Sequence, residues 1–114
     1  MTVKIGKREV GEVTVVDLSG RLTLGDASAQ LRDTLRDLLG QGRRKIVLNL
    51  GQLAYIDSSG LGELVSGFTT VKNQGGQLKL TNLTQKVNDL LTITKLYTVF
   101  EVHNDEKAAV SSFS

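Results

Sequence analysis

Two adjacent serines, Ser58 and Ser59, carry the hydroxyl groups whose surroundings most suggest chemistry in this chain. Asp57 precedes them, and Gly60-Leu-Gly62 follows. A serine hydroxyl can act as a nucleophile, accept a phosphoryl group, or cap the first turn of a helix. The neighbouring residues are therefore the first guide to function.

A nucleophilic serine needs a base, and His103 is the only histidine of the chain. The nucleophile elbow of many hydrolases carries a glycine two residues before the serine, whereas Ile56 holds that place before Ser58. No cysteine is available as another nucleophile. A small hydrolase that uses Ser58 stays a third hypothesis, and we expect a protein that is not an enzyme.

The simplest interpretation of Asp57-Ser-Ser-Gly60 is a helix cap, because such residues satisfy the free amides of a first turn. The same place also suits a phosphoryl group, since a helix N-terminus favours negative charge by roughly 0.3 to 1 kcal/mol. A phosphoserine would add about 1.5 to 2 negative charges beside Asp57, which a bound partner would have to desolvate. The pattern predicts a modification that changes binding and leaves the fold intact.

Small residues recur after the serines at Gly62, Ser66 and Thr70, four positions apart. On a helix these residues share one face, over which another protein could approach closely. An ordinary exposed helix face has the same spacing, and the sequence favours neither interpretation.

Patterns for cofactors and nucleic acids are missing. The phosphate-binding loop pattern does not occur, and Gly60-Leu-Gly62 lacks the further glycine of a dinucleotide-binding loop. The acidic residues show no metal-ligand spacing. Lys and Arg number 14 against 12 Asp and Glu, and these charges are interspersed. We expect no cofactor, no metal and no direct contact with nucleic acid.

Apolar periodicity predicts the elements that position the serines. Strands are predicted from residue 3 onward and at 13–18, 45–50, 77–81 and 99–102. Helices are predicted after residue 26, at 58–74 and after residue 84, with a last helix or frayed tail at 105–113. Strands alternate with helices after the opening hairpin, so we expect an α/β fold with a mixed, mostly parallel sheet.

Turn and cap residues mark the ends of these elements. Gly11-Glu12 is expected to turn the first hairpin. Residues 21–26 are expected to form a loop whose last residue, Asp26, caps the first helix. Gly40 or Gly42 should end that helix, Gly75-Gly76 should close the second, and Thr84 should cap the third.

The chain has 114 residues without proline, long linkers or repeats, so we expect a single domain over residues 1–114. The longest uninterrupted apolar run, residues 53–56, is far shorter than the roughly 18 residues of a membrane span. The N-terminus lacks the apolar segment of a secretion signal. The expected location is the cytoplasm, without membrane association.

The order of elements, together with the motif Tyr55-Ile-Asp-Ser-Ser-Gly-Leu-Gly62, resembles the anti-sigma factor antagonists of the STAS domain class. The similarity runs over residues 3–105, with supporting matches at Val16–Gly20, Leu31-Arg32 and Gly75-Gly76. It implies a STAS-like fold in which a sheet of about five strands carries about four helices.

The resemblance also implies a function. Ser58 would be phosphorylated by a partner that is both an anti-sigma factor and a serine kinase. The unphosphorylated form would bind this partner and release a sigma factor, and a PP2C-type phosphatase would restore the free serine. A monomer or weak dimer is expected. The residues expected to contact the partner are Asp57, Ser59, Gly60, Gly62, Thr23, Asp26 and Ser66.

Each residue of the motif then has an expected part. Asp57 sets the local charge and orientation, Ser59 caps the helix or supplies a second hydroxyl, and Gly60 lets the backbone of a partner come close. Thr23 stands where the family commonly has Asp, with Asp26 a partial substitute, and Asn49 stands where an acidic residue is frequent. These departures imply a different preference among kinases.

A second hypothesis keeps the STAS fold without the switch. In it the domain is a scaffold, or a subunit of a signalling or lipid-transport complex, and Ser58 is not phosphorylated. A charge at Ser58 should leave partner binding nearly unchanged in this second hypothesis, whereas the switch predicts a strong loss.

Overall fold

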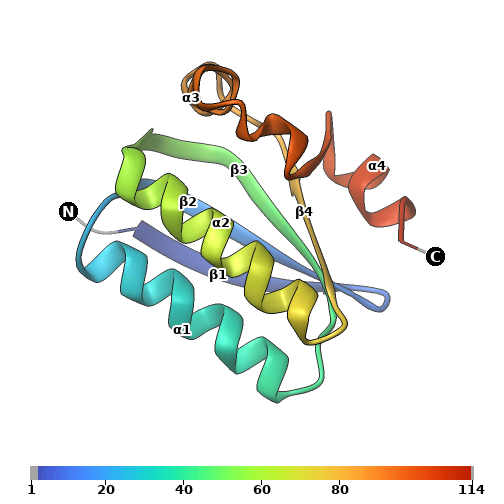
Figure 1. The fold of residues 1–114 in the computed structure, drawn as a ribbon. Coiled ribbons are helices and arrows are strands. Elements are labelled where there is room, and N and C mark those ends of the chain that lie inside the picture. The colour runs from blue at the N-terminus through green and yellow to red at the C-terminus, as the bar shows by residue number, and fades with distance from the viewer. Residues whose placement is uncertain (1–2, 114) are drawn as a thin grey trace.

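The computed structural model describes residues 3–113, and these form one five-stranded sheet in the order β1-β2-β3-β4-β5. The strands are β1 (Val3–Val10), β2 (Val13–Leu22), β3 (Lys45–Ile56), β4 (Gln77–Thr81) and β5 (Glu101–His103). β1 runs antiparallel to β2, and every later neighbour pairs in parallel. The mixed, mostly parallel sheet is confirmed (Figure 1).

The helices are α1 (Asp26–Gly40), α2 (Ser58–Asn73), α3 (Gln85–Thr94) and α4 (Glu106–Ser111), with a short 3-10 turn η1 (Leu96–Thr98). α1 and α2 lie side by side across one face of the sheet, and α3 lies beyond α2 (Figure 1). Parallel strands joined by right-handed crossovers place successive helices on the same face. None of the helices over residues 3–113 is long and apolar enough to cross a membrane.

The main core lies between this face of the sheet and the first three helices. The buried apolar residues of the helices are Ala27, Leu31, Leu35, Leu38 and Leu39 of α1, Leu61 and Leu64 of α2, and Val87 and Leu91 of α3. The middle strand β3 contributes Ile46, Leu48 and Leu50 to this core, whereas Val47 belongs to a smaller cluster on the opposite face, and all four are 0% exposed. Such a run of buried apolar residues is typical of a central strand that is covered on both faces.

Several predicted ends are also confirmed. The turn at residues 11 and 12 joins β1 to β2, and Thr84 Oγ1 accepts a hydrogen bond from the Val87 N–H (3.3 Å). Gly42 lies at φ +82° just after α1, and the Arg43 N–H donates to the Leu38 carbonyl (2.9 Å). This is the Schellman ending that a glycine after a helix makes possible.

Other predicted ends are wrong. β2 continues to Leu22, so residues 21 and 22 belong to a strand and not to the loop. β3 continues to Ile56, six residues past the predicted end. The last strand begins at Glu101, two residues after the predicted start, because Val99 and Phe100 form a turn and a bend after η1. Asp26 does not cap α1. Gly25 is the N-cap residue, and Asp26 is already helical.

Among residues 3–113, the short helix α4 is the helix that packs on the opposite face of the sheet, and charged side chains hold it in place. Ala109 packs on a small apolar cluster of β2 and β3. The Lys79 ammonium, on a side chain that is 6% exposed, lies 2.9 Å from Glu101 and donates to Ser112 Oγ (2.8 Å). His103 and Lys79 hold the pKa of Glu101 below its usual value through hydrogen bonds.

Arg8 forms a second anchor for α4. Its guanidinium donates to Asp17 (2.6 and 2.9 Å) and to Glu106 at the start of α4 (2.6 and 3.1 Å). The hydrogen bonds from Arg8 lower the pKa of Asp17, and a hydrogen bond from the Asn49 amide lowers it further. The two carboxylates in turn raise the pKa of Arg8. Arg8 therefore joins β1, β2 and α4.

Replacing Arg8 should destabilise the protein in a pH-dependent way. We expect Arg8→Gln to lower the free energy of unfolding by about 1 kcal/mol at pH 7, since the pairs are partly exposed. Because the pKa of Asp17 is depressed on folding, this stability is present above the unfolded pKa of about 4 and is lost as the pH falls through the folded pKa. Urea unfolding at a series of pH values measures the difference.

The control is Lys7→Gln, which removes the same charge from an exposed residue of the same strand. Among residues 3–113, no ion pair of Lys7 is found, so this variant should match the wild type within about 0.5 kcal/mol. A difference between Arg8→Gln and wild type that stayed constant into strong acid would contradict the role of Asp17.

Candidate functional site

α2 begins where β3 ends, and Asp57 is the residue that caps it. Its backbone is extended (φ −108°, ψ −177°), and its Oδ1 accepts a hydrogen bond from the Gly60 N–H at 2.8 Å. The Leu61 N–H bonds to the Asp57 carbonyl at 2.9 Å, which closes the first turn. The carboxylate thus supplies the cap, and Ser59, predicted as a cap or second hydroxyl, does not supply it.

Ser58 is the first residue of α2 and is exposed. Within the described residues its hydroxyl makes no hydrogen bond, because Asp57 already provides the cap. His103, the only candidate base, lies on β5, which β4 separates from β3. The imidazole contacts Glu101 at 2.6 Å and is not brought to Ser58. The hydroxyl is free for an external reagent, without a base of its own in contact.

Gly60 is buried, and it packs against Leu22 and Ile56 of the same chain. A Cβ at this position would lie 2.1 Å from the carbonyl oxygen of Leu22 and 3.1 Å from a side-chain carbon of Ile56. The predicted role of Gly60, to let the backbone of a partner come close, is therefore wrong. The glycine instead lets the start of α2 rest on the end of β2.

The same edge of the sheet brings Thr23 and Asp26 toward the serine motif, because parallel strands end on the same side. The Leu22 carbonyl accepts from the Asp57 N–H at 3.4 Å, so the loop after β2 begins beside the start of α2. Thr23 is half-buried and its carbonyl accepts from Ser28 Oγ (2.8 Å), whereas Asp26 is exposed.

Two features of this edge could not be predicted from the sequence. Leu24, in the loop after β2, is 77% exposed, and a single leucine outside any apolar periodicity gave no signal. Tyr55 lies between two cations, Arg21 at 4.5 Å and Lys86 at 4.8 Å from its ring centre. Cations stack on aromatic faces in this way. Arg21 and Lys86 therefore bring positive charge to the edge that carries Ser58.

The predicted face of small residues on α2 lies partly toward α1. Gly62 and Ser66 are exposed, but Ser66 and Thr70 line a shallow groove of about 80 Å³ between the two helices. An ion pair between Arg32 and Glu63 (3.1 Å) spans the same groove. Gly62 and Ser66 are thus accessible, although the face as a whole is not an open surface.

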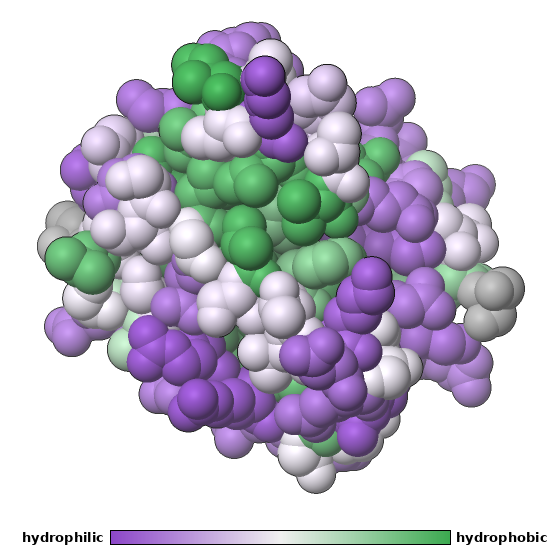
Figure 2. Space-filling model, viewed as in Figure 1, coloured by the Kyte–Doolittle hydropathy of each residue, from purple (hydrophilic) through white to green (hydrophobic). Residues whose placement is uncertain are grey.

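A different face of α2 is apolar and open. Ser58, Val65 and Lys72 are spaced so that they share one side of the helix. Figure 2 shows apolar side chains gathered between α2 and the segment formed by α3 and η1. The partly buried apolar residues of these elements are Val65, Phe68, Leu90, Leu96 and Val99, and we call them the α2–α3 patch.

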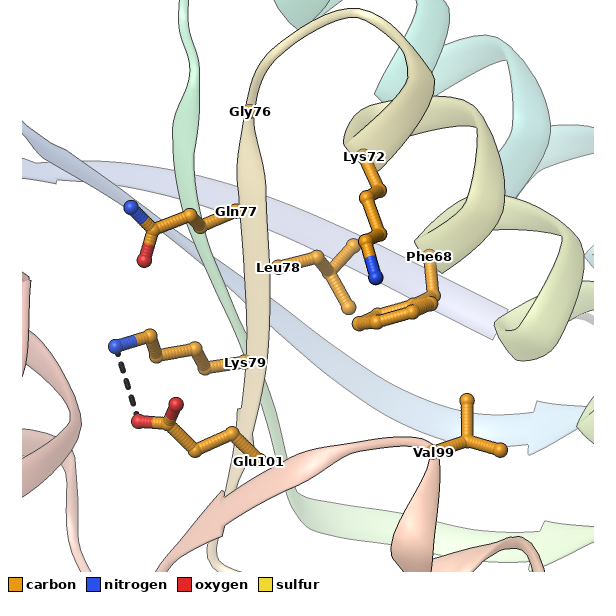
Figure 3. A pocket seen from close by; sticks show the side chains of 8 residues that line it. All are labelled: Phe68, Lys72, Gly76, Gln77, Leu78, Lys79, Val99 and Glu101. Carbon is orange, nitrogen blue, oxygen red and sulfur yellow. Dashed lines mark ion pairs between the residues drawn. The ribbon is translucent and has the colours of Figure 1, made fainter.

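The patch leads to a pocket of about 250 Å³ at the far end of α2, shown in Figure 3. Phe68 and Lys72 point into it from α2, opposite Leu78 of β4 and Val99. Phe68 follows Ser58 by ten residues, which is about 15 Å along a helix. The pocket is therefore a separate feature from the serine motif.

Residues 3–113 form a small α/β fold in which the Ser58 hydroxyl, at the start of α2, has no hydrogen-bond partner among the described residues. The family model of the STAS domain matches residues 4–109. The chain belongs to the STAS domain family, among the anti-sigma factor antagonists, as the curated relatives show.

The anti-sigma-B factor antagonist of Bacillus subtilis (strain 168) is 31% identical over 110 residues, covering 96% of this chain and 99% of the relative. The anti-sigma F factor antagonist of Paenibacillus polymyxa is 26% identical, covering 97% of this chain and 95% of the relative.

Solved structures agree in fold. An anti-sigma factor antagonist from Mycobacterium paratuberculosis superposes with a TM-score of 0.83 at 15% identity, covering 97% of this chain and 93% of the other. The unphosphorylated form of the anti-sigma factor antagonist SpoIIAA gives a TM-score of 0.72 at 23% identity, covering 95% and 96%. The phosphorylated form of SpoIIAA from Bacillus gives 0.71. At these identities the likeness confirms the fold.

The two glycines of the motif should respond to alanine in opposite directions. We expect Gly60→Ala to lower the free energy of unfolding by at least about 2 kcal/mol, because its Cβ would overlap the Leu22 carbonyl. Gly62→Ala should raise it by roughly 0.5 to 1 kcal/mol, since nothing lies within 4 Å and alanine favours helix. Urea unfolding of the two variants measures these free energies. Similar stabilities of the two variants would contradict the close contact at Gly60.

Proposed function

We propose that this protein is an anti-sigma factor antagonist that is switched by phosphorylation of Ser58. The unphosphorylated form binds an anti-sigma factor that is also a serine kinase, and so releases a sigma factor. Transfer of the γ-phosphoryl group of ATP to Ser58 Oγ abolishes the complex. A PP2C-type phosphatase reverses the modification. The protein itself is a binding module in the cytoplasm and not an enzyme.

The observation that carries the proposal is the exposed hydroxyl of Ser58 at the start of α2, which makes no hydrogen bond within residues 3–113. Because the Asp57 carboxylate makes the capping bond, a phosphoryl group on Ser58 would break no hydrogen bond of the fold. The helix N-terminus favours the added negative charge, and Arg21 and Lys86 place positive charge on the ring of Tyr55, three residues before Ser58. The modified protein would therefore stay folded.

The surface around Ser58 supports binding by another protein. Exposed Leu24 and Asp26 lie on one side of the motif, and the α2–α3 patch extends along α2 on the other. An apolar surface next to a modifiable serine suits an interface that a charge can disrupt. We infer that Thr23, Asp26, Asp57, Ser59, Gly62 and Ser66 contact the partner and that Gly60 acts by holding α2 in place.

The names of the relatives support the same proposal. Two curated relatives are named as antagonists of anti-sigma factors, and SpoIIAA is known in phosphorylated and unphosphorylated forms. Residues 4–109 match the STAS family model, and we infer that residues 1–114 act as a single domain. We further infer a monomer or weak dimer.

Phosphorylation is tested with the anti-sigma factor kinase encoded in the same genome and MgATP. We expect wild type to gain one phosphoryl group, located on Ser58 by peptide mass spectrometry. Ser58→Ala should gain none, and the control Ser59→Ala should gain as much as wild type. No phosphate on wild type, or equal phosphate on Ser58→Ala, would refute the switch.

Binding of the same kinase is tested by calorimetry with a charge at Ser58. We expect Ser58→Asp to weaken binding at least about tenfold, because the carboxylate would be desolvated beside Asp57 in the interface. The control is Ser111→Asp on α4, an exposed serine on the opposite face, which should bind as wild type does. Unchanged binding of Ser58→Asp would favour a scaffold without a phosphorylation switch.

A further inference from the structure

Asn49 on β3 makes three hydrogen bonds that require both a donor and an acceptor. Its Nδ2 donates to Asp17 Oδ1 (2.8 Å), while its Oδ1 accepts from the Gly51 N–H (3.1 Å) and from Asn82 Nδ2 (3.1 Å). A carboxylate at this position would have no hydrogen to offer Asp17. A Cβ on Gly51 would lie 3.2 Å from the Cβ of Asn82, so the group is closely packed.

These bonds lie where β3 departs from regular pairing with β2. β2 advances five residues from Asp17 to Leu22, whereas β3 advances seven from Asn49 to Ile56, with two register shifts between them. Extra residues of this kind form β-bulges, which bend a strand and change what it presents. Gly51, whose N–H is bonded to Asn49, belongs to the first irregular step.

The extra residues of β3 determine which residue of β3 pairs with the last residue of β2. With them, Ile56 pairs with Leu22, and the Asp57 N–H lies 3.4 Å from the Leu22 carbonyl. Gly60 packs against the same carbonyl. A slip of one residue would turn the side chains at the end of β3 to the opposite face. Since Ser58 follows Ile56 by two residues, its place on the surface depends on this register.

We propose that Asn49 is a positioning residue for Ser58. Its amide holds the first bulge of β3, and the bulge brings the start of α2 onto the end of β2. Asn49 acts through the backbone and contacts neither Ser58 nor, in this proposal, the partner. This role of Asn49 deepens the proposed function. It rests on that function in the phosphorylation test, whereas the hydrogen-exchange tests are independent of it.

The first test is amide hydrogen exchange of Asn49→Asp, observed by NMR. The change preserves size, removes the donor and sets a carboxylate against Asp17. We expect exchange at Gly51, Asp57 and Gly60 to accelerate at least about fivefold, the factor for a loss of about 1 kcal/mol. Amides of β4 should keep their wild-type rates.

The charged groups that face the substituted position are Arg8 and Asp17 from the first two strands and, through Arg8, Glu106 from α4. The control is Asn88→Asp, which makes the same chemical change on an exposed residue of α3 and should alter none of these rates. Unchanged exchange at Asp57 and Gly60 in Asn49→Asp would overturn the proposal. A uniform acceleration throughout the sheet would overturn it too, since Asn49 would then contribute only to the overall stability of the protein and not to the position of α2.

A second variant tests the hydrogen-bond pattern itself. Asp17→Asn in the Asn49→Asp background restores one donor between the two side chains, with the roles exchanged. We expect exchange at Asp57 and Gly60 to return to within about twofold of wild type, because the donor and acceptor match again. Effects of the two substitutions that simply add, without rescue, would contradict the proposed contact.

The kinase supplies an independent readout. We expect kcat/KM for phosphorylation of Ser58 to fall at least about fivefold in Asn49→Asp and to recover in the double variant, with Asn88→Asp unaffected. If wild-type protein gains no phosphate, the proposed function fails while the exchange measurements still decide the role of Asn49. If Ser58 is phosphorylated equally in all variants, the positioning role is refuted and the switch stands.

Discussion

The contact between Gly60 and the carbonyl of Leu22 is the constraint that organises the functional end of this protein. A side chain at residue 60 would overlap that oxygen, so only glycine allows the first turn of α2 to rest on the end of β2. The contact requires Ile56 to lie level with Leu22, and this in turn requires two more residues in β3 than in β2. A local packing contact therefore governs the pairing of two central strands.

Most of the fold could be predicted because its apolar residues follow simple periods. The helix stripes and the buried run at Ile46–Leu50 are read directly from spacing. The second half of β3 could not be predicted in this way, because its bulges interrupt the alternation by which a strand is recognised. The cap of α1 was misassigned since Gly25 and Asp26 are both acceptable caps, and only the backbone path decides between them.

The serine motif was easier to place than to interpret. The sequence predicted a helix start at Ser58 and left open which residue caps it, because Asp57, Ser58 and Ser59 can all accept an amide hydrogen bond. The structure gives that bond to Asp57. Exposed Leu24 and the cations around Tyr55 come from other elements, so they become neighbours of the motif only through the tertiary fold.

The two faces of the sheet are stabilised by different means, and this difference suits a binding module. The helical face is held by continuous apolar packing, and the residues of the α2–α3 patch pack against this core. The other face is held by a small apolar cluster around Ala109 together with ion pairs and side-chain hydrogen bonds, among them those of Arg8, Lys79 and Asn49. Directional bonds specify register more strictly than apolar contacts do, because each donor needs one acceptor. The polar face can thus define where β3 ends, while the apolar face supports the helix that begins there.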